Sequence, residues 1–286
     1  MMRRTLPLVL VATLALTACD RGQEGKPVTV IEFGEDGTNT RRAAATATPT
    51  PAAAGACEQV VFEQIPLVHC VADPARHRIR MDLGPSGGGA PYRSFAKLAE
   101  ARGEGAPPVA FAMNAGMFDG EGKPIGYYVE GGERLKQLNR NDGAGNFHLK
   151  PNGVFFGTGS RWQVMAAERF YADVGDRPEF GTQSGPMLLI DGKVHPEITA
   201  DGPSRTTRNA VGVDRQARAH FVIADGPISF GRLARYFRDE LKTPNALYLD
   251  GSVSALWNPA SGRMDDGTLI GPMVVVEDSA TEGRAP

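Results

Sequence analysis

Short apolar runs separated by turn-forming residues dominate the chain from residue 57 onward. These runs predict β-strands at residues 60–65, 78–83, 109–113, 126–130, 153–156, 163–165, 187–190, 210–213, 220–224, 246–249 and 273–276. Between them, the sequences Gly131-Gly132, Gly157-Thr158-Gly159-Ser160 and Asp191-Gly192 favour the positive φ values of tight hairpin turns. Because strands joined by hairpins pair antiparallel, the pattern predicts a mainly antiparallel sheet system.

Two segments, 92–102 and 229–242, instead repeat apolar residues every three to four positions and predict helices. Ser229 is a suitable N-cap for the second helix, and Thr243-Pro244 stops it. Since this helix separates the strands at 220–224 and 246–249, we expect a crossover connection and at least one parallel pair of strands. The expected fold class is α+β: a mainly antiparallel mixed β-sheet system with a few helices.

The first 19 residues have the layout of a secretory signal. Arg3 and Arg4 precede an apolar run at 6–16, which is too short for a comfortable membrane span, and small residues lead to Cys19. The ending Leu16-Thr17-Ala18-Cys19 resembles a bacterial lipobox, in which the cysteine is lipidated. We therefore expect a cell-envelope lipoprotein attached to the membrane by an N-terminal lipid anchor and facing the periplasm. The alternative is an ordinary cleaved signal and a secreted periplasmic protein.

Residues 20–56 shift to Gly, Thr, Ala and Pro, a composition that predicts a disordered tether. The run at 28–33 is the one candidate strand within it, and we leave it out. The folded domain is expected at 57–278, followed by a disordered tail at 279–286. Export places Cys57 and Cys70 in an oxidising compartment, where we expect them to form a disulfide; two free buried thiols are the alternative.

Composition and charge narrow the classes of function. The chain has 31 Lys+Arg and 33 Asp+Glu residues, a net charge of −2, and so lacks the basic footprint of a nucleic-acid-binding protein. Its 35 glycines and 21 prolines, with 41% hydrophobic residues, fit a turn-rich folded domain with a sizeable core. HExxH and P-loop motifs are absent, and the five histidines lack ligand-type spacing, so we expect no metal and no cofactor.

Two aspartates each end a predicted strand without a hairpin return: Asp225 and Asp250. If the two strands are parallel neighbours, both carboxylates lie at the same edge of the sheet. A carboxylate pair is the minimal equipment for glycoside hydrolysis, in which one protonates the leaving oxygen and the other acts as base or nucleophile. The alternative is that Asp225 caps a turn and Asp250 alone is functional.

Basic and amide side chains precede two other predicted strands. Arg208 enters the strand at 210–213, and its planar guanidinium suits a phosphate or carboxylate; the alternative is a solvent-facing arginine. Lys150 and Asn152 precede the strand at 153–156, where the alternative is a loop that only packs.

Four motifs, in this order, resemble the phosphodiester glycosidase superfamily, whose founding member removes N-acetylglucosamine from a sugar phosphodiester. They are Met113-Asn114-Ala115-Gly116-Met117-Phe118, Gln183-Ser184-Gly185-Pro186 before Asp191-Gly192, Arg208-Asn209-Ala210-Val211-Gly212, and Leu249-Asp250-Gly251-Ser252. The resemblance spans about residues 60–276. The chain departs from the family pattern at two places: Ala115, where the family has glycine, and the Ser252-Val253-Ser254 run. These departures resemble the sequences of a bacterial branch of exported proteins long labelled as a domain of unknown function.

The resemblance implies a pocket with Asp250, Asp225 and Asn114 as catalytic candidates. The substrate-binding candidates are Arg208, Ser184, Gly185, Lys150, Asn152, Gly116, Gly251 and Ser252. The function implied is an exported hydrolase that cleaves a glycosyl-1-phosphodiester, or a related glycosidic bond, in an envelope or extracellular glycan. The alternatives are a non-catalytic lipoprotein that binds envelope polysaccharide or peptidoglycan, and a metal-dependent phosphodiesterase.

Overall fold

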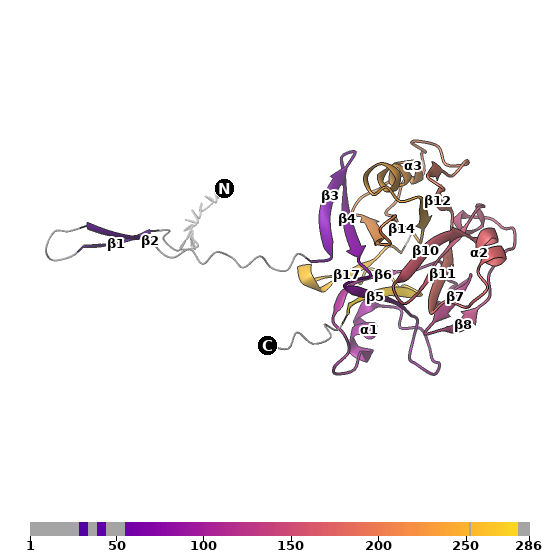
Figure 1. Cartoon of the computed structure of the whole chain (residues 1–286), viewed down its shortest axis with the longest axis horizontal. Helices are drawn as coiled ribbons and strands as arrows, with labels where there is room; N and C mark the ends of the chain where they lie inside the picture. Colours follow the sequence, from indigo (N-terminus) through magenta and orange to yellow (C-terminus); the bar gives the residue numbers. More distant parts are fainter. Residues whose placement is uncertain (1–28, 34–38, 44–54, 252, 280–286) are drawn as a thin grey trace, which may run out of the picture. The chain divides into compact units, whose positions relative to one another are not determined.

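The computed structural model describes residues 29–33, 39–43, 55–251 and 253–279 (Figure 1). The chain divides into two units, Met1–Ala52 and Ala53–Pro286. In the first unit, β1 (Thr29–Phe33) pairs antiparallel with β2 (Asn39–Ala43), so the run that we left out does form a strand. The signal, Cys19, most of the predicted tether and nearly all of the predicted tail lie outside the described residues, and those expectations stay predictions.

The second unit contains three β-sheets. The first has the order β10-β9-β11-β7-β8, the second β13-β12-β16-β14-β15-β4-β3 and the third β18-β17-β6-β19-β5. Their strands are β3 (Cys57–Phe62), β4 (Ile65–Ala72), β5 (His77–Asp82), β6 (Val109–Asn114), β7 (Tyr128–Glu130), β8 (Glu133–Lys136), β9 (Gly153–Thr158), β10 (Arg161–Ala166), β11 (Phe180–Ser184), β12 (Met187–Ile190), β13 (Lys193–Val194), β14 (Asn209–Val213), β15 (Ala219–Ala224), β16 (Asn245–Tyr248), β17 (Leu256–Asn258), β18 (Arg263–Met264) and β19 (Met273–Asp278). The predicted fold class is confirmed.

Helices are few and short: α1 (Phe95–Ala101), α2 (Ala167–Asp173), α3 (Phe230–Arg235), a π-helical turn η2 (Tyr236–Glu240) that continues α3, and the 3₁₀ turns η1 (Asn146–His148) and η3 (Pro259–Ser261). Ser94 and Ser229 cap α1 and α3, accepting hydrogen bonds from the backbone N–H groups of Lys97 and Arg232. Both predicted helices are confirmed. Within the described ranges, no helix is long and apolar enough to cross a bilayer.

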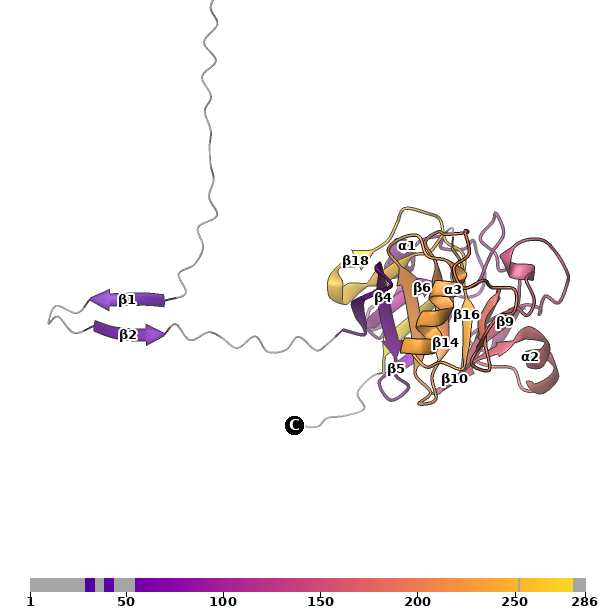
Figure 2. The same cartoon turned by 90° about the horizontal axis from the view of Figure 1, so that it is seen from above.

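One hydrophobic core is shared by the three sheets. Phe111 of β6, Phe155 of β9 and Phe221 of β15 come from different sheets, and the Phe221 ring lies 5.3 Å from that of Phe111 and 5.6 Å from that of Phe155. The opposite face of each sheet is covered by its own helix: α3 on the seven-stranded sheet, α1 on the sheet of β6 and α2 on the sheet of β9. Figure 2 shows α3 lying over β14 and β16.

The expected parallel pair does not form. The strands β15 and β16 both pair antiparallel with β14, which lies between them, and every other pairing among the described strands is also antiparallel. Because β15 and β16 each run opposite to β14, they run in the same direction and end at the same edge of the sheet. Asp225 and Asp250 therefore follow strand ends at one edge, as the sequence predicts, but with a strand between them.

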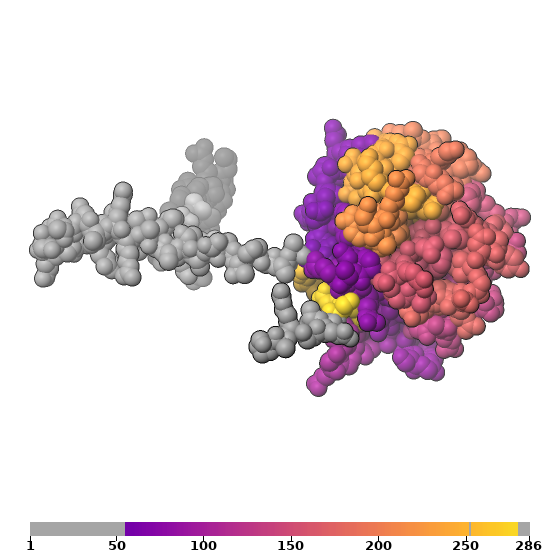
Figure 3. All heavy atoms as spheres, viewed as in Figure 1, coloured from indigo at the N-terminus to yellow at the C-terminus, as the bar shows by residue number. Residues whose placement is uncertain are grey.

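The predicted strand at 60–65 spans a turn that the sequence does not mark. Glu63 and Gln64 have φ values of 46° and 67° and join β3 to β4 as a two-residue hairpin without glycine. Cys57 and Cys70 face each other across this hairpin and form the predicted disulfide. Figure 3 shows the β3–β4 region, in indigo, along one flank of the domain.

The disulfide fixes the edge strand β3 to β4. Because a cross-link of this loop size restricts the unfolded chain, we expect the Cys57→Ala, Cys70→Ala double variant to lose about 3 kcal/mol of unfolding free energy. Chemical denaturation in oxidising and reducing buffer measures the effect. The native protein should lose stability on reduction, whereas the double variant should be insensitive to it. Equal stability of the two proteins in oxidising buffer would contradict the prediction.

Candidate active site

Three chain segments meet where β6 and β16 end and β14 begins. Asn114 is the last residue of β6, Asn209 is the first of β14, and Asp250 follows β16 by two residues. The Asn209 side-chain Oδ1 accepts a hydrogen bond from the Asp250 backbone N–H at 2.9 Å, and its Nδ2 donates to Asn114 Oδ1 at 2.9 Å and to Asn114 O at 3.1 Å. All three residues are buried. The Asn209 amide therefore joins the sheet of β6 to the loop that carries Asp250.

Asn114 contributes a donor to this edge. Its Oδ1 also accepts from the Ala255 backbone N–H at 2.8 Å. Its Nδ2 is buried and finds no hydrogen-bond partner among the described residues. Since an unpaired buried donor is destabilising, this group is suited to a partner supplied by a ligand.

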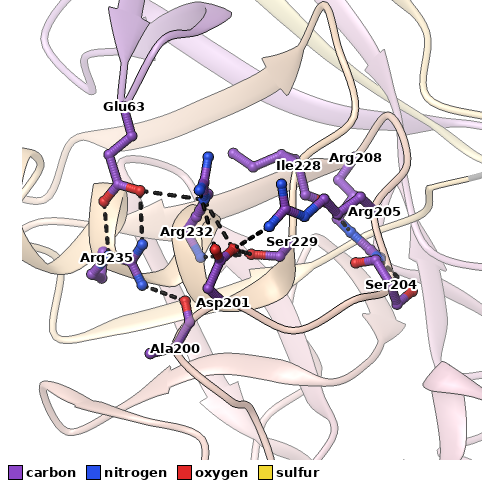
Figure 4. Close-up of polar contacts among 10 residues, drawn as sticks. All are labelled: Glu63, Ala200, Asp201, Ser204, Arg205, Arg208, Ile228, Ser229, Arg232 and Arg235. Carbon is purple, nitrogen blue, oxygen red and sulfur yellow. Dashed lines mark hydrogen bonds and ion pairs between the residues drawn. The ribbon is translucent and has the colours of Figure 1, made fainter.

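Arg208 is almost completely buried, with an exposed fraction of 1%. Its Nε donates to the Ile228 carbonyl at 2.9 Å and its Nη2 to the Ser204 Oγ at 3.1 Å, as Figure 4 shows. The Phe230 ring centroid lies 3.7 Å from its Cζ. Burial lowers the pKa of Arg208 from its usual range, but an arginine stays protonated at neutral pH. The sheet edge thus holds a buried positive charge.

No carboxylate of the described residues forms an ion pair with Arg208. Its contacts are carbonyl and hydroxyl oxygens and aromatic rings, and its Nη1 has no hydrogen-bond partner of acceptable geometry in the described part of the chain. The Tyr248 hydroxyl also interacts with the guanidinium, but it forms no hydrogen bond with Nη1. Because a buried cation without a counter-charge is costly, the site is suited to an anion.

Tyr248 connects Arg208 to Asp250. Burial, together with the negative charge of Asp250, raises the pKa of Tyr248 to about 12, while the charge of Arg208 opposes the rise. The phenol is therefore neutral at physiological pH. The next loop leaves no room for a side chain beside it, because a Cβ on Gly251 would lie 2.1 Å from the Tyr248 hydroxyl. Gly251 is thus required for close packing against this tyrosine.

The loop that carries Asp250 is held by several hydrogen bonds. Asp250 Oδ1 accepts from the Gly251 backbone N–H at 2.6 Å, and the Ser254 hydroxyl donates to the Asp250 carbonyl at 2.8 Å. The buried hydroxyl of Ser184 donates to the Leu249 carbonyl. The predicted site residue Ser184 therefore supports the loop from the end of β11.

Asp225 lies at the same sheet edge but in a different environment. It is exposed, and its carboxylate accepts a hydrogen bond from Arg263 Nη1 at 2.9 Å. Because β14 separates β15 from β16, the backbones at Asp225 and Asp250 lie roughly 10 Å apart. A cavity of about 430 Å³ opens at this edge, and Asp225, Arg263, Thr207 and Ser254 are among the residues that line it.

Lys150 and Asn152 both have polar partners in the structure. Lys150 is exposed, and its Nζ donates to the Arg140 carbonyl at 2.9 Å and to Asp142 at 2.6 Å. Asn152 is buried; its Nδ2 donates to the Phe147 carbonyl at 2.9 Å, and its Oδ1 accepts from Gln183 Nε2 of β11 at 3.4 Å. The part that either side chain plays in substrate binding stays a prediction.

The predicted glycines have packing roles. A Cβ on Gly116 would lie 2.2 Å from the Gln183 carbonyl, and the Gly116 N–H donates to Thr182 Oγ1 at 3.1 Å. A Cβ on Gly185 would lie 2.7 Å from that of Asn152. Ser252, the last of the predicted residues, lies outside the described residues.

Sequence reasoning missed Asn209, Tyr248, Phe230 and Ser204 as site residues. One signal was available: Tyr248 precedes Asp250 by two positions, so in an extended chain both side chains lie on the same face. The sequence contains no such signal for Asn209 or Phe230, because an asparagine at the start of a strand and a phenylalanine in a helix often have only a structural role. Among the described residues, no three His, Cys, Asp or Glu side chains are grouped so that they could hold a metal ion.

The Asn209 amide is expected to be essential for the geometry of this edge. Replacing Asn209 with Ala removes four side-chain hydrogen bonds, including one from the Ser254 hydroxyl at 3.5 Å, and takes away the acceptor of the buried Asp250 N–H. We therefore expect a loss of about 2–4 kcal/mol in unfolding free energy. Asn258→Ala is the matched control, because Asn258 is also buried but its Oδ1 has no partner in the described chain. Thermal and chemical denaturation should show a clearly larger loss for Asn209→Ala; an equal loss would contradict the role of the amide.

Comparison with known proteins matches this geometry to a family. The model of the phosphodiester glycosidase family matches residues 108–271, which include Asn114, Arg208 and Asp250. The uncharacterized protein YigE of Escherichia coli K12 is 32% identical over 185 residues, which cover 65% of this chain and 71% of YigE.

Two solved structures are similar. The catalytic domain of zebrafish N-acetylglucosamine-1-phosphodiester alpha-N-acetylglucosaminidase, auto-inhibited by its pro-peptide, gives a TM-score of 0.52 at 14% identity, covering 90% of this chain and 86% of that domain. A hypothetical protein from Synechocystis gives a TM-score of 0.47 at 15% identity, covering 78% and 61%. The family match and the shared fold lead to one conclusion: the chain belongs to the phosphodiester glycosidase family.

Proposed function

We propose that this protein is an exported hydrolase that cleaves a glycosyl-1-phosphodiester, or a related glycosidic bond, in an envelope or extracellular glycan. The observation that carries the proposal is the buried guanidinium of Arg208, which has no carboxylate partner among the described residues and an unpaired Nη1. A phosphodiester supplies the missing negative charge. Family membership supports the same class of reaction.

The proposed reaction breaks the bond between the anomeric carbon and the phosphate oxygen. The guanidinium of Arg208 binds the phosphate, and Asp250 takes a proton from a water molecule that attacks the anomeric carbon. The bonding electrons leave with the phosphate monoester, whose growing negative charge Arg208 stabilises. If Asp250 itself attacks instead, it forms a glycosyl-enzyme intermediate that water then hydrolyses.

A phosphate monoester is a good leaving group, so this reaction does not require a strong general acid. Asp225, paired with Arg263 at the rim of the neighbouring cavity, is the second carboxylate of the proposal. The unpaired Nδ2 of Asn114 is the proposed donor to a substrate oxygen. The cavity itself, with polar residues such as Thr207 and Ser254 in its lining, is the proposed place of the sugar.

We propose that Cys19 is lipidated and attaches the protein to the periplasmic side of a membrane. Replacing Cys19 with Ala should abolish incorporation of labelled palmitate and move the protein from the membrane fraction to the soluble fraction. The Cys57→Ala, Cys70→Ala variant is the control and should stay with the membrane. Retention of the label by Cys19→Ala would exclude the lipidation of Cys19.

The hydrolase proposal predicts that Asp250→Asn lowers turnover at least about 1000-fold while the melting temperature stays nearly unchanged, because the change removes the reacting charge but keeps the shape. Arg208→Lys should lower kcat/KM by about 100-fold or more, because an ammonium cannot reproduce the planar fork. The measurement is release of reducing sugar from a panel of sugar-1-phosphodiesters, including UDP-sugars.

Arg205→Lys is the matched control for Arg208→Lys, because Arg205 is a nearby exposed arginine that pairs with Asp201. Its activity should equal that of the native protein. Undiminished turnover by Asp250→Asn would contradict the assigned role of that residue. If the native protein turns over no member of the panel but is stabilised by some, the non-catalytic glycan binder becomes the better account.

A further inference from the structure

A second cavity, of about 460 Å³, lies beside α2 and the strands β7 and β8, which Figure 1 shows close together at one end of the domain. Among the residues that line it are Tyr127, Arg134, Arg140, Phe170, Tyr171 and Arg177. None of its lining residues belongs to the cavity beside Asp225. It is therefore a separate candidate binding site, which the proposed reaction does not use.

Three aromatic residues are among those that line this cavity. Phe170 packs edge-to-face against Tyr127, with ring centroids 4.9 Å apart, and both rings are largely buried. Tyr171, in contrast, has an exposed fraction of 63%. The guanidinium of Arg140 lies 4.1 Å from its ring centroid and is itself held by Glu168 through Nη2 at 2.7 Å. Tyr171 is thus an exposed ring held in place, which suits binding better than packing.

The rim carries positive charge that is not neutralised by the protein. Arg134 and Arg177 form no ion pair with the described residues, and Arg177 donates only to the Gly132 carbonyl, at 3.3 Å. Burial raises the pKa of Tyr127, and the positive charges of both arginines oppose this rise. Asp176 is the single acidic residue in the lining.

We propose that this cavity binds an anionic saccharide: a sugar ring rests against the exposed Tyr171 ring while its carboxylate or phosphate binds Arg134 and Arg177. Planar guanidinium groups match carboxylate and phosphate geometry, and an aromatic face offers an apolar surface to the C–H face of a sugar. A neutral sugar has no negative charge for the arginines to bind, and a small inorganic anion has no apolar face to pack against an aromatic ring.

The cavity and the candidate active site are close along the chain, so one polymeric substrate could occupy both. Gln137, Leu138 and Arg140 line the cavity, and a few residues later the same segment reaches Asn146, whose side chain interacts with Tyr248 and lowers its pKa. Nine residues span at most about 30 Å, so the two sites border one short segment. The cavity therefore anchors a polyanionic glycan near the bond to be cleaved; this last step rests on the proposed function, whereas binding in the cavity does not.

Isothermal titration calorimetry of the full chain tests the binding with three probes: tetragalacturonate, which has a carboxylate on each sugar, neutral maltotetraose and inorganic phosphate. Tetragalacturonate should bind more tightly than either of the other probes, and its affinity should fall as salt is raised. The Arg134→Gln, Arg177→Gln double variant should bind it at least about tenfold more weakly. Tyr171→Ala should weaken binding of tetragalacturonate but leave phosphate binding unchanged.

The Arg78→Gln, Arg161→Gln double variant is the control, because it removes the same charge from two exposed positions outside the cavity. It should bind like the native protein. Absence of tetragalacturonate binding, equal affinity for maltotetraose, or equal weakening in the control would overturn the proposal. Because the readout is heat of binding, lack of turnover would leave the proposal intact.

Discussion

The side-chain amide of Asn209 is the interaction on which the candidate active site depends. In the interior, the seven-stranded sheet and the sheet of β6 meet mainly through apolar side chains, and such packing has no direction. The Asp225–Arg263 ion pair joins the same two sheets at the surface. The Asn209 hydrogen bonds do have direction, and they fix the end of β6 and the Asp250 loop against the first residue of β14. Arg208 precedes this residue in the chain, so its guanidinium is positioned by the same anchor.

Charge is distributed unevenly around that anchor. Two carboxylates of the neighbouring surface are paired with other arginines: Glu63 with Arg235, and Asp201 with Arg232 and Arg205 (Figure 4). The first pair holds the β3–β4 turn against α3, and Asp201 holds the loop before β14 against the same helix. Arg208 is left with oxygen atoms of the backbone and Ser204. Glu63 and Asp201 thus satisfy the surface arginines and leave the buried one for an anion from outside.

The sequence predicts most strands because their apolar residues are buried in one continuous core. It fails at Glu63-Gln64, where a tight turn forms without glycine, and at β11, whose residues Thr182, Gln183 and Ser184 are buried although they are polar. It also misses α2, because two helical turns are too short to establish a period. In each case a tertiary contact overrides the local preference of the chain.

The same limit applies to the site. Asn114, Arg208 and Asp250 belong to motifs in the sequence, and the structure places all three where the sheet of β6 meets the seven-stranded sheet. Their chemical roles stay predictions. Lys150 and Gly116 belong to similar segments, yet their polar groups hydrogen-bond with Asp142 and Thr182. Which partner a polar group finds depends on segments distant in the chain, and a strand-like residue such as Tyr248 gains its importance only from that arrangement.

The arrangement of one shared core with a separate helix behind each sheet has an evolutionary consequence. Residues on α2 face only the outer side of their own sheet, whereas Asn114, Asn209 and Asp250 lie where two other sheets meet. Substitutions around α2 can therefore accumulate without moving the groups proposed to react. Members of the family are free to diverge in this outer layer while the junction of the two other sheets stays the same.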